Sequence, residues 1–78
     1  MAHRLTARTI ADSCVNRFLS DHGTEIDALN LDAQLLIGDK VRVWRQRLED
    51  KLADHLDAHD GQLETSHVAD LIASVGRP

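Results

Sequence analysis

The chain is poor in the residues that hold many small domains together or that stack on bases. Its 78 residues include one cysteine, one proline, one phenylalanine, one tryptophan and no tyrosine. The single Cys14 excludes an internal disulfide and a zinc site built from cysteines. It lies on an apolar helical stripe with no histidine placed to activate it, which favours a core residue over a nucleophile. Aromatic side chains do not alternate with basic ones, which argues against a binder of single-stranded nucleic acid.

Long apolar segments are missing as well. No run approaches the roughly 18 apolar residues of a membrane span, and the start of the chain lacks the apolar core of a signal peptide. We therefore expect no membrane partner and a cytoplasmic location. The length predicts a single domain over residues 1–78.

The charge is distributed in blocks. A net charge of −4 argues against a protein that coats nucleic acid by bulk charge. Basic residues nevertheless concentrate in residues 1–17 and 40–51, whereas residues 18–39 and 52–76 contain acids but no lysine or arginine. A site for a polyanion is therefore expected near the start or the middle of the chain.

Apolar residues recur at helical spacing near both ends of the chain. Ile10, Cys14 and Phe18 predict a first helix over about residues 6–22, with Thr6 as its N-cap and Gly23 as its stop. A third, short helix is expected over about residues 66–74. Thr65 or Ser66 would cap its start, and Gly76 would end it.

The second predicted helix is long. It follows a cap at Asn30, ends at Gly61, and extends its apolar stripe backwards to Leu31 and Leu35, with Gly38 as the position where it could break. Such a helix is roughly 43 Å long, whereas a compact chain of this size is about 30 Å across. We expect the two shorter helices to cover only part of its stripe, which predicts an obligate dimer. The predicted interface residues are Ile37, Val41, Trp44, Leu48, Leu52 and Leu56.

Two stretches of the chain resemble the histone fold, in which a long central helix lies between two shorter ones. The segment from Asn30 to Gly61 is similar in length and stop signal to the central helix of archaeal histones. The segment from Gln62 to Val68 looks like the second loop and third-helix start of that family. The resemblance implies an all-α, histone-fold-like dimer of short, long and short helices that binds DNA or pairs with a homologous chain.

The same resemblance suggests which residues would contact DNA. Arg4, Arg8 and Arg17 are similar to the basic first-helix residues with which histones approach phosphates, although they could equally be a solvated helix face. Both loops depart from the family because they carry acids and no base, so wrapping of DNA through the loops is not expected. A second basic group is more simply explained by local ion pairs such as Arg45 with Glu49. Its members are Lys40, Arg42, Arg45, Arg47 and Lys51.

Sites for catalysis or metals are not apparent. His55 and His59 stand four residues apart on a helix, a spacing that can chelate a metal, but no third ligand is fixed by spacing. Two histidines that border a dimer interface and make assembly sensitive to pH are the favoured interpretation. No phosphate-binding loop or nucleophile arrangement appears, so we expect no enzyme, no cofactor, no metal and no small-molecule substrate.

Two functions follow from these patterns. The first is a small architectural protein, associated with the nucleoid, that binds double-stranded DNA as a histone-like dimer without sequence preference. The second is an acidic helical dimerisation module, such as an antitoxin or a subunit of a larger complex, that does not bind DNA. The resemblance favours the first function, and the net charge favours the second.

Overall fold

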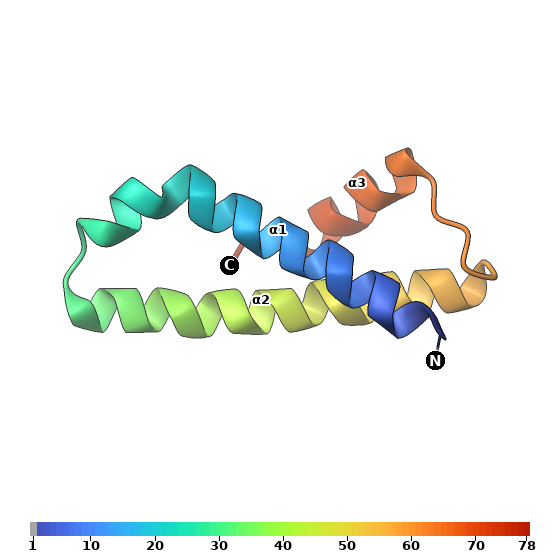
Figure 1. The fold of residues 1–78 in the computed structure, drawn as a ribbon, viewed down its shortest axis with the longest axis horizontal. Coiled ribbons are helices and arrows are strands. Elements are labelled where there is room, and N and C mark those ends of the chain that lie inside the picture. Colours follow the sequence, from blue (N-terminus) through green and yellow to red (C-terminus); the bar gives the residue numbers. More distant parts are fainter. Residues whose placement is uncertain (1) are drawn as a thin grey trace.

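The structure is a computed structural model that describes residues 2–78, with side chains from His3 onward. It consists of three helices: α1 (Ala2–Asp27), α2 (Leu31–Ala58) and α3 (Thr65–Val75). Figure 1 shows that α1 and α3 both run opposite to α2 and lie along it. The described residues contain no strand. The predicted all-α fold of three helices is therefore confirmed.

The first helix is longer at both ends than the predicted 6–22. Thr6 lies inside α1 and is not its N-cap, and α1 continues through Gly23. A helical glycine costs only about 1 kcal/mol, which the flanking turns can offset. The carbonyls at the end of α1 have a partner that the local sequence does not reveal, because the Gln34 side chain of α2 donates to the carbonyls of Ile26 at 3.2 Å and Leu29 at 3.0 Å.

The second helix begins as the sequence indicates. The Asn30 side chain accepts a hydrogen bond from the Ala33 amide at 2.9 Å, so the predicted N-cap is confirmed. The helix continues through Gly38 without a break and ends at Ala58. Gly61 then adopts a φ of +81°, and its amide donates to the Leu56 carbonyl at 2.7 Å.

The third helix begins one residue earlier than predicted, at Thr65. Glu64 occupies the N-cap position without a side-chain hydrogen bond, so the prediction that Thr65 or Ser66 caps this helix is wrong. Gly76 ends the helix with a φ of +84°, as the sequence predicts.

The core is a single stripe along α2 that α1 and α3 cover from its middle to its end. Leu52 and Leu56 pack against Ala7, whose side chain is fully buried. Trp44 and Leu48 pack against the equally buried Ala11. The Trp44 indole N–H donates to the Gly76 carbonyl at 2.8 Å, which fixes the end of α3 on the middle of α2.

The dimensions show how one chain accommodates a helix that seemed too long for it. The molecule measures 44 × 22 × 17 Å, with a radius of gyration of 13.8 Å, against about 11.5 Å for a compact chain of this length. The premise that a single chain of this length would be compact, from which the dimer was predicted, is therefore wrong. Because α1 has 26 residues, it runs beside most of the 28-residue α2, and the fold is elongated instead of globular.

Shortening a side chain in this stripe should destabilise the fold. Leu48→Ala removes a residue that is 1% exposed, and we expect the free energy of unfolding to fall by about 2–5 kcal/mol. Leu5→Ala is the matched control, because Leu5 is 69% exposed, and we expect a change within about 0.5 kcal/mol. Urea unfolding followed by circular dichroism measures both. Equal losses in the two variants would contradict this core.

Candidate interaction surface

Glu49 of α2 is the centre of an ion-pair network that joins α1 to α2. Its side chain is only 5% exposed and lies 3.2 Å from Arg4, 3.3 Å from Arg8 and 3.1 Å from Arg45. Arg4 also contacts Asp50 at 2.7 Å. A buried carboxylate is tolerated when charged donors surround it. The network therefore engages Arg4 and Arg8 of α1 in contacts within the chain, although both side chains remain about half exposed.

Two carboxyl groups respond to this network in their pKa. Burial alone would raise the pKa of Glu49, but hydrogen bonds from Arg45 and Arg8 outweigh it and hold the pKa below its ordinary value of 4.5. A hydrogen bond from Arg4 is the main cause that lowers the pKa of Asp50. Both groups therefore favour the folded state when they are ionised.

The arginines predicted to contact DNA do not form one free surface. Arg4 and Arg8 are held by Glu49 and Asp50. Arg17 lies farther along α1, where its side chain is 86% exposed and its contact with Asp21 is a long 4.0 Å. Arg17 is thus largely exposed, whereas Arg4 and Arg8 are paired with acidic side chains of α2.

The residues predicted to form the dimer interface are mostly covered within one chain. All except Ile37 are buried, and α1 and α3 pack against them. Ile37 is half-buried beside the C-terminal half of α1. The buried members are Val41, Trp44, Leu48, Leu52 and Leu56.

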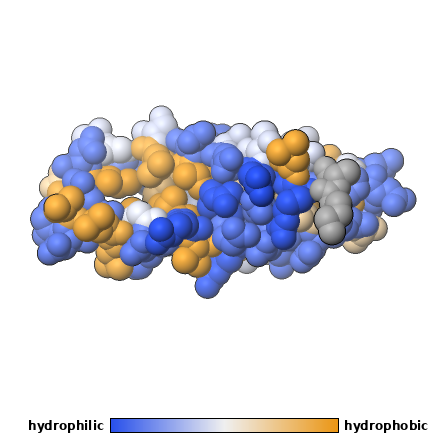
Figure 2. Space-filling model, turned by 60° about the horizontal axis from the view of Figure 1, so that its bottom comes forward, coloured by the Kyte–Doolittle hydropathy of each residue, from blue (hydrophilic) through white to orange (hydrophobic). Residues whose placement is uncertain are grey.

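A second set of apolar side chains on α2 points away from this core. Leu31, Leu35, Leu36 and Val43 are 69%, 62%, 57% and 51% exposed. At about 100° per residue, Leu35, Leu36 and Val43 lie roughly 120–160° around α2 from Val41, and Leu31 lies at the edge of the same face, roughly 80° from Val41. Figure 2 shows apolar atoms gathered over the half of the molecule where α2 begins, whereas the other half is mostly hydrophilic. We call these four residues the exposed apolar face.

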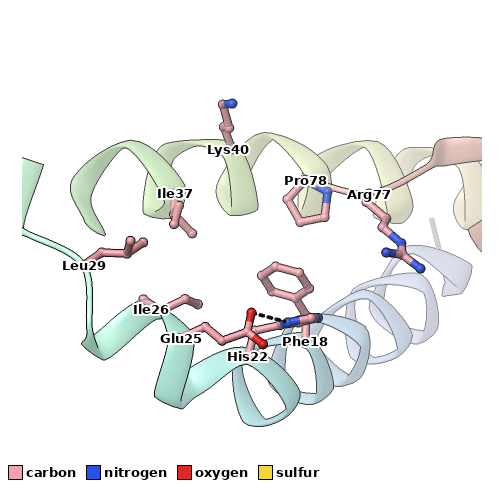
Figure 3. Close-up of a pocket in the computed structure, with 9 residues that line it drawn as sticks. All are labelled: Phe18, His22, Glu25, Ile26, Leu29, Ile37, Lys40, Arg77 and Pro78. Carbon is pink, nitrogen blue, oxygen red and sulfur yellow. Dashed lines mark hydrogen bonds and ion pairs between the residues drawn. The ribbon is translucent and has the colours of Figure 1, made fainter. Parts of the chain in front are cut away.

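Between α1 and the start of α2 the two helices leave a cavity of about 420 Å³. Figure 3 shows Phe18 and Ile26 of α1 facing Ile37 of α2 across it, with Pro78 beside Phe18, whereas Lys40 points away. His22 and Glu25 close one side through a contact of 3.4 Å. The presence of this cavity shows that α1 and α2 pack less tightly here than around Ala7 and Ala11, which are fully buried.

The exposed apolar face was not predicted from the sequence, because Leu31 and Leu35 were assigned to the buried stripe of this helix. Leu31 and Leu35 were expected to continue the core stripe, and this is wrong: both are more than half exposed. Around the helix axis, Leu35 is displaced from Val41 by roughly 120° and Leu31 by roughly 80°. The spacing of Leu36 and Val43, seven residues apart, was the available signal of a second apolar face.

Metal chelation has no support in the described residues. No group of three histidine, cysteine or acidic side chains among residues 2–78 is arranged to hold a metal ion. Cys14 is half-buried, and burial raises the pKa of its thiol, which disfavours the reactive thiolate. Within the same residues, no helix has the length and apolar character to cross a membrane.

Comparisons with protein-family models, with curated proteins and with solved structures find no match for this chain. The candidate site therefore depends on the geometry above: a network that uses the α1 arginines, and an uncovered apolar face on α2.

Neutralising the buried carboxylate should weaken the fold. Glu49→Gln removes the charge that Arg4, Arg8 and Arg45 share, and we expect a loss of about 1.5–3 kcal/mol in the free energy of unfolding. Because the folded pKa of Glu49 is lowered, its contribution is complete above the ordinary value of 4.5 and is lost as the pH falls through the folded pKa. The variant should therefore lose less stability than wild type on acidification below about pH 4.5.

The control for that experiment is Glu25→Gln. Glu25 is 80% exposed and contacts only His22 among the described residues, so its replacement should change stability by less than about 0.5 kcal/mol. Acid titrations followed by circular dichroism compare the three proteins. A Glu49→Gln curve that parallels wild type would contradict the proposed role of this carboxylate.

Proposed function

We propose that this chain is a helical protein-interaction module that functions as a dimer with a second copy of itself. The exposed apolar face of α2 is the observation that carries the proposal. Apolar side chains that are half exposed or more, gathered at one end of a small helical chain, mark association surfaces in water-exposed proteins. Leu31, Leu35, Leu36 and Val43 would be buried between the two copies, and Trp44 and Leu48 would remain inside each copy.

The accessible surface of the chain supports this partner. A compact monomer of 8.7 kDa is expected to expose about 4,700 Å², whereas this chain exposes 5571 Å². The excess of roughly 900 Å² is close to the surface of about 800 Å² that each partner buries in a stable interface. A second copy would therefore remove the surplus without further change in the chain.

Charge around the face also favours a two-fold arrangement. Asp32 and Lys40 lie one turn on either side of Leu36. If two α2 helices cross antiparallel with Leu36 at the two-fold axis, each Asp32 meets Lys40 of the second copy, because both lie four residues from the centre. Lys40 forms no ion pair within the described residues. The face is thus self-complementary in charge and in hydrophobicity.

Introducing a charge into the exposed apolar face tests the dimer. Leu36→Glu should place two carboxylates at the two-fold axis, so that the protein sediments as a monomer at concentrations where wild type is a dimer. Leu5→Glu is the matched control, because Leu5 is as exposed as Leu31 but lies on α1. Analytical ultracentrifugation over a hundredfold range of concentration measures the effect. A monomeric wild type, or a dimeric Leu36→Glu variant, would overturn the proposal.

DNA binding is the second candidate, and a specific observation favours it at other residues than those first expected. Arg47, Lys51 and Arg77 form no ion pair among the described residues. Arg47 lines one cavity together with Arg77 and another together with Lys51, so the three cations are neighbours. Trp44 lines the first of these cavities but is only 7% exposed, so it offers little surface for stacking, which favours phosphate contacts to a duplex over binding of single strands.

A mobility-shift series separates the two candidates. If DNA is bound, replacing Arg47, Lys51 and Arg77 by Gln should weaken binding at low salt and lower the salt slope by about 0.9 for each lost phosphate contact. Replacing Arg8 alone by Gln is the control, measured at a temperature where circular dichroism shows the variant folded; it should change binding little because that side chain is held by Glu49. Absence of any shift at low salt, with the protein folded, would leave the dimer module without a DNA function.

We propose no more of a histone fold than its order of helices, with a long central helix between two others. The order of helices around a long α2 supports it, whereas an α1 of 26 residues departs from the short first helix of that pattern. The acidic composition and the paired α1 arginines favour the interaction module over an architectural DNA protein.

A further inference from the structure

Three histidines form one cluster where α2 ends and α3 begins: His55 in the last turn of α2, His59 at its C-cap and His67 in the first turn of α3. The rings of His55 and His59 are stacked, with centroids 4.0 Å apart and an interplanar angle of 19°. His67 of α3 meets His55 edge-on at 5.5 Å. His59 is the first residue of the connection between the two helices, which spans residues 59–64. The three rings therefore lie where α2 and α3 join.

The ring of His55 has an unusual environment. Its Nε2 atom is buried and has no hydrogen-bond partner among the described residues. The Nδ1 atom of His59 lies 2.8 Å from the His55 carbonyl, which orients the second ring over the first. A buried nitrogen without a partner is acceptable in a neutral ring but costly in a charged one.

The charged groups around the cluster come from each neighbouring segment. Asp60 and Glu64 line a cavity of about 210 Å³ together with His59 and His67, so carboxylates adjoin the outer two rings. His3 of α1 lies close above Gly61, where an added Cβ would come within 2.6 Å of the imidazole ring. His55 lies outside the cavity lining, and its ring contacts those of His59 and His67.

We propose that His55, His59 and His67 form a pH-sensitive joint that holds α3 against α2 when the rings are neutral and releases it when they are protonated. Protonation places positive charges 4.0 and 5.5 Å apart with a buried nitrogen between them. The two nearby carboxylates offset part of this repulsion at His59 and His67. The α2 C-terminus also favours a charged ring at His55, but the buried Nε2 without a partner and the two neighbouring rings outweigh it there, so the contact between His55 and His67 separates.

The direction of the pH effect follows from the surroundings of His55. Burial first, and then the charges of His59 and His67, lower its pKa below the ordinary value of 6.5. The unfolded or released state therefore binds the proton more readily than the docked state. Stability of the joint is complete above about pH 6.5 and is lost as the pH falls through the lowered pKa of His55.

The molecule carries its own reporter of this release. Trp44 is the only tryptophan, and its indole N–H donates to the Gly76 carbonyl at the end of α3. When α3 leaves α2, the indole loses this bond and gains water, so its emission should shift to longer wavelength. The loss of helical ellipticity should be no larger than the 11 residues of α3 can account for.

The experiment is a titration of the full chain from about pH 8 to about pH 5, with chelator present, followed by tryptophan emission and circular dichroism. This range stays above the ordinary pKa of Glu49, so the network around that residue remains ionised. Wild type should show the emission shift with a midpoint below 6.5. His55→Leu should lose the shift or move its midpoint by at least about one pH unit. His22→Gln, a histidine of α1 outside the cluster, should behave as wild type.

Proton NMR of the histidine rings in wild type provides a measurement that needs no variant. The His55 signal should titrate below pH 6.5, and its titration should coincide with the tryptophan emission shift. The proposal is overturned if emission does not change over this range, if His55→Leu retains the wild-type transition, or if His55 titrates at 6.5 or above.

Discussion

The arrangement of this chain depends on a gradient of side-chain size along the buried face of α1. Ala7 and Ala11 are fully buried and let the backbone of α1 approach Leu52 and Trp44 closely. One and two turns later the same face carries Cys14 and Phe18. The Phe18 ring lies 5.7 Å from the Trp44 ring and holds the two helices apart. A taper from small to large residues inclines α1 relative to α2, as Figure 1 shows.

The taper divides the molecule into two ends with different properties. At the narrow end, close packing brings Arg4 and Arg8 within reach of Glu49 and Asp50, so the basic groups of α1 are neutralised internally. At the wide end, α1 stands away from α2 and a cavity of about 420 Å³ remains between them. There α2 carries apolar residues on two sides, and α1 can cover only one of them. The ion pairs at one end and the cavity at the other are therefore both products of the same inclination.

The sequence was a good guide where the signal was local. The Asn30 cap, the Gly76 stop and the periodicity of the α2 stripe each depend on neighbouring residues, and each is found in the structure. The length of α1 was not predictable in this way, because Gly23 resembles a stop until Gln34 of the next helix is known to satisfy the last carbonyls.

The candidate site was less accessible to sequence reasoning. Arg4 and Arg8 carry no sign of their partners, since Glu49 and Asp50 are more than 40 residues away. The orientation of Leu35 and Leu36 around α2 depends on where α1 and α3 pack. The histidine cluster could be predicted only in part. The spacing of four residues between His55 and His59 indicates that their rings are close, whereas His67 reaches them only through the path of the α2–α3 connection.

The elongated shape has a consequence for how the molecule moves in solution. A body of 44 × 22 × 17 Å experiences more friction than a sphere of equal mass, and it tumbles about its long axis faster than end over end. Amide groups that point along α2 and those that point across it will therefore relax at different rates. If a second copy adds to the breadth of the molecule and not to its length, this anisotropy will decrease as the mass doubles.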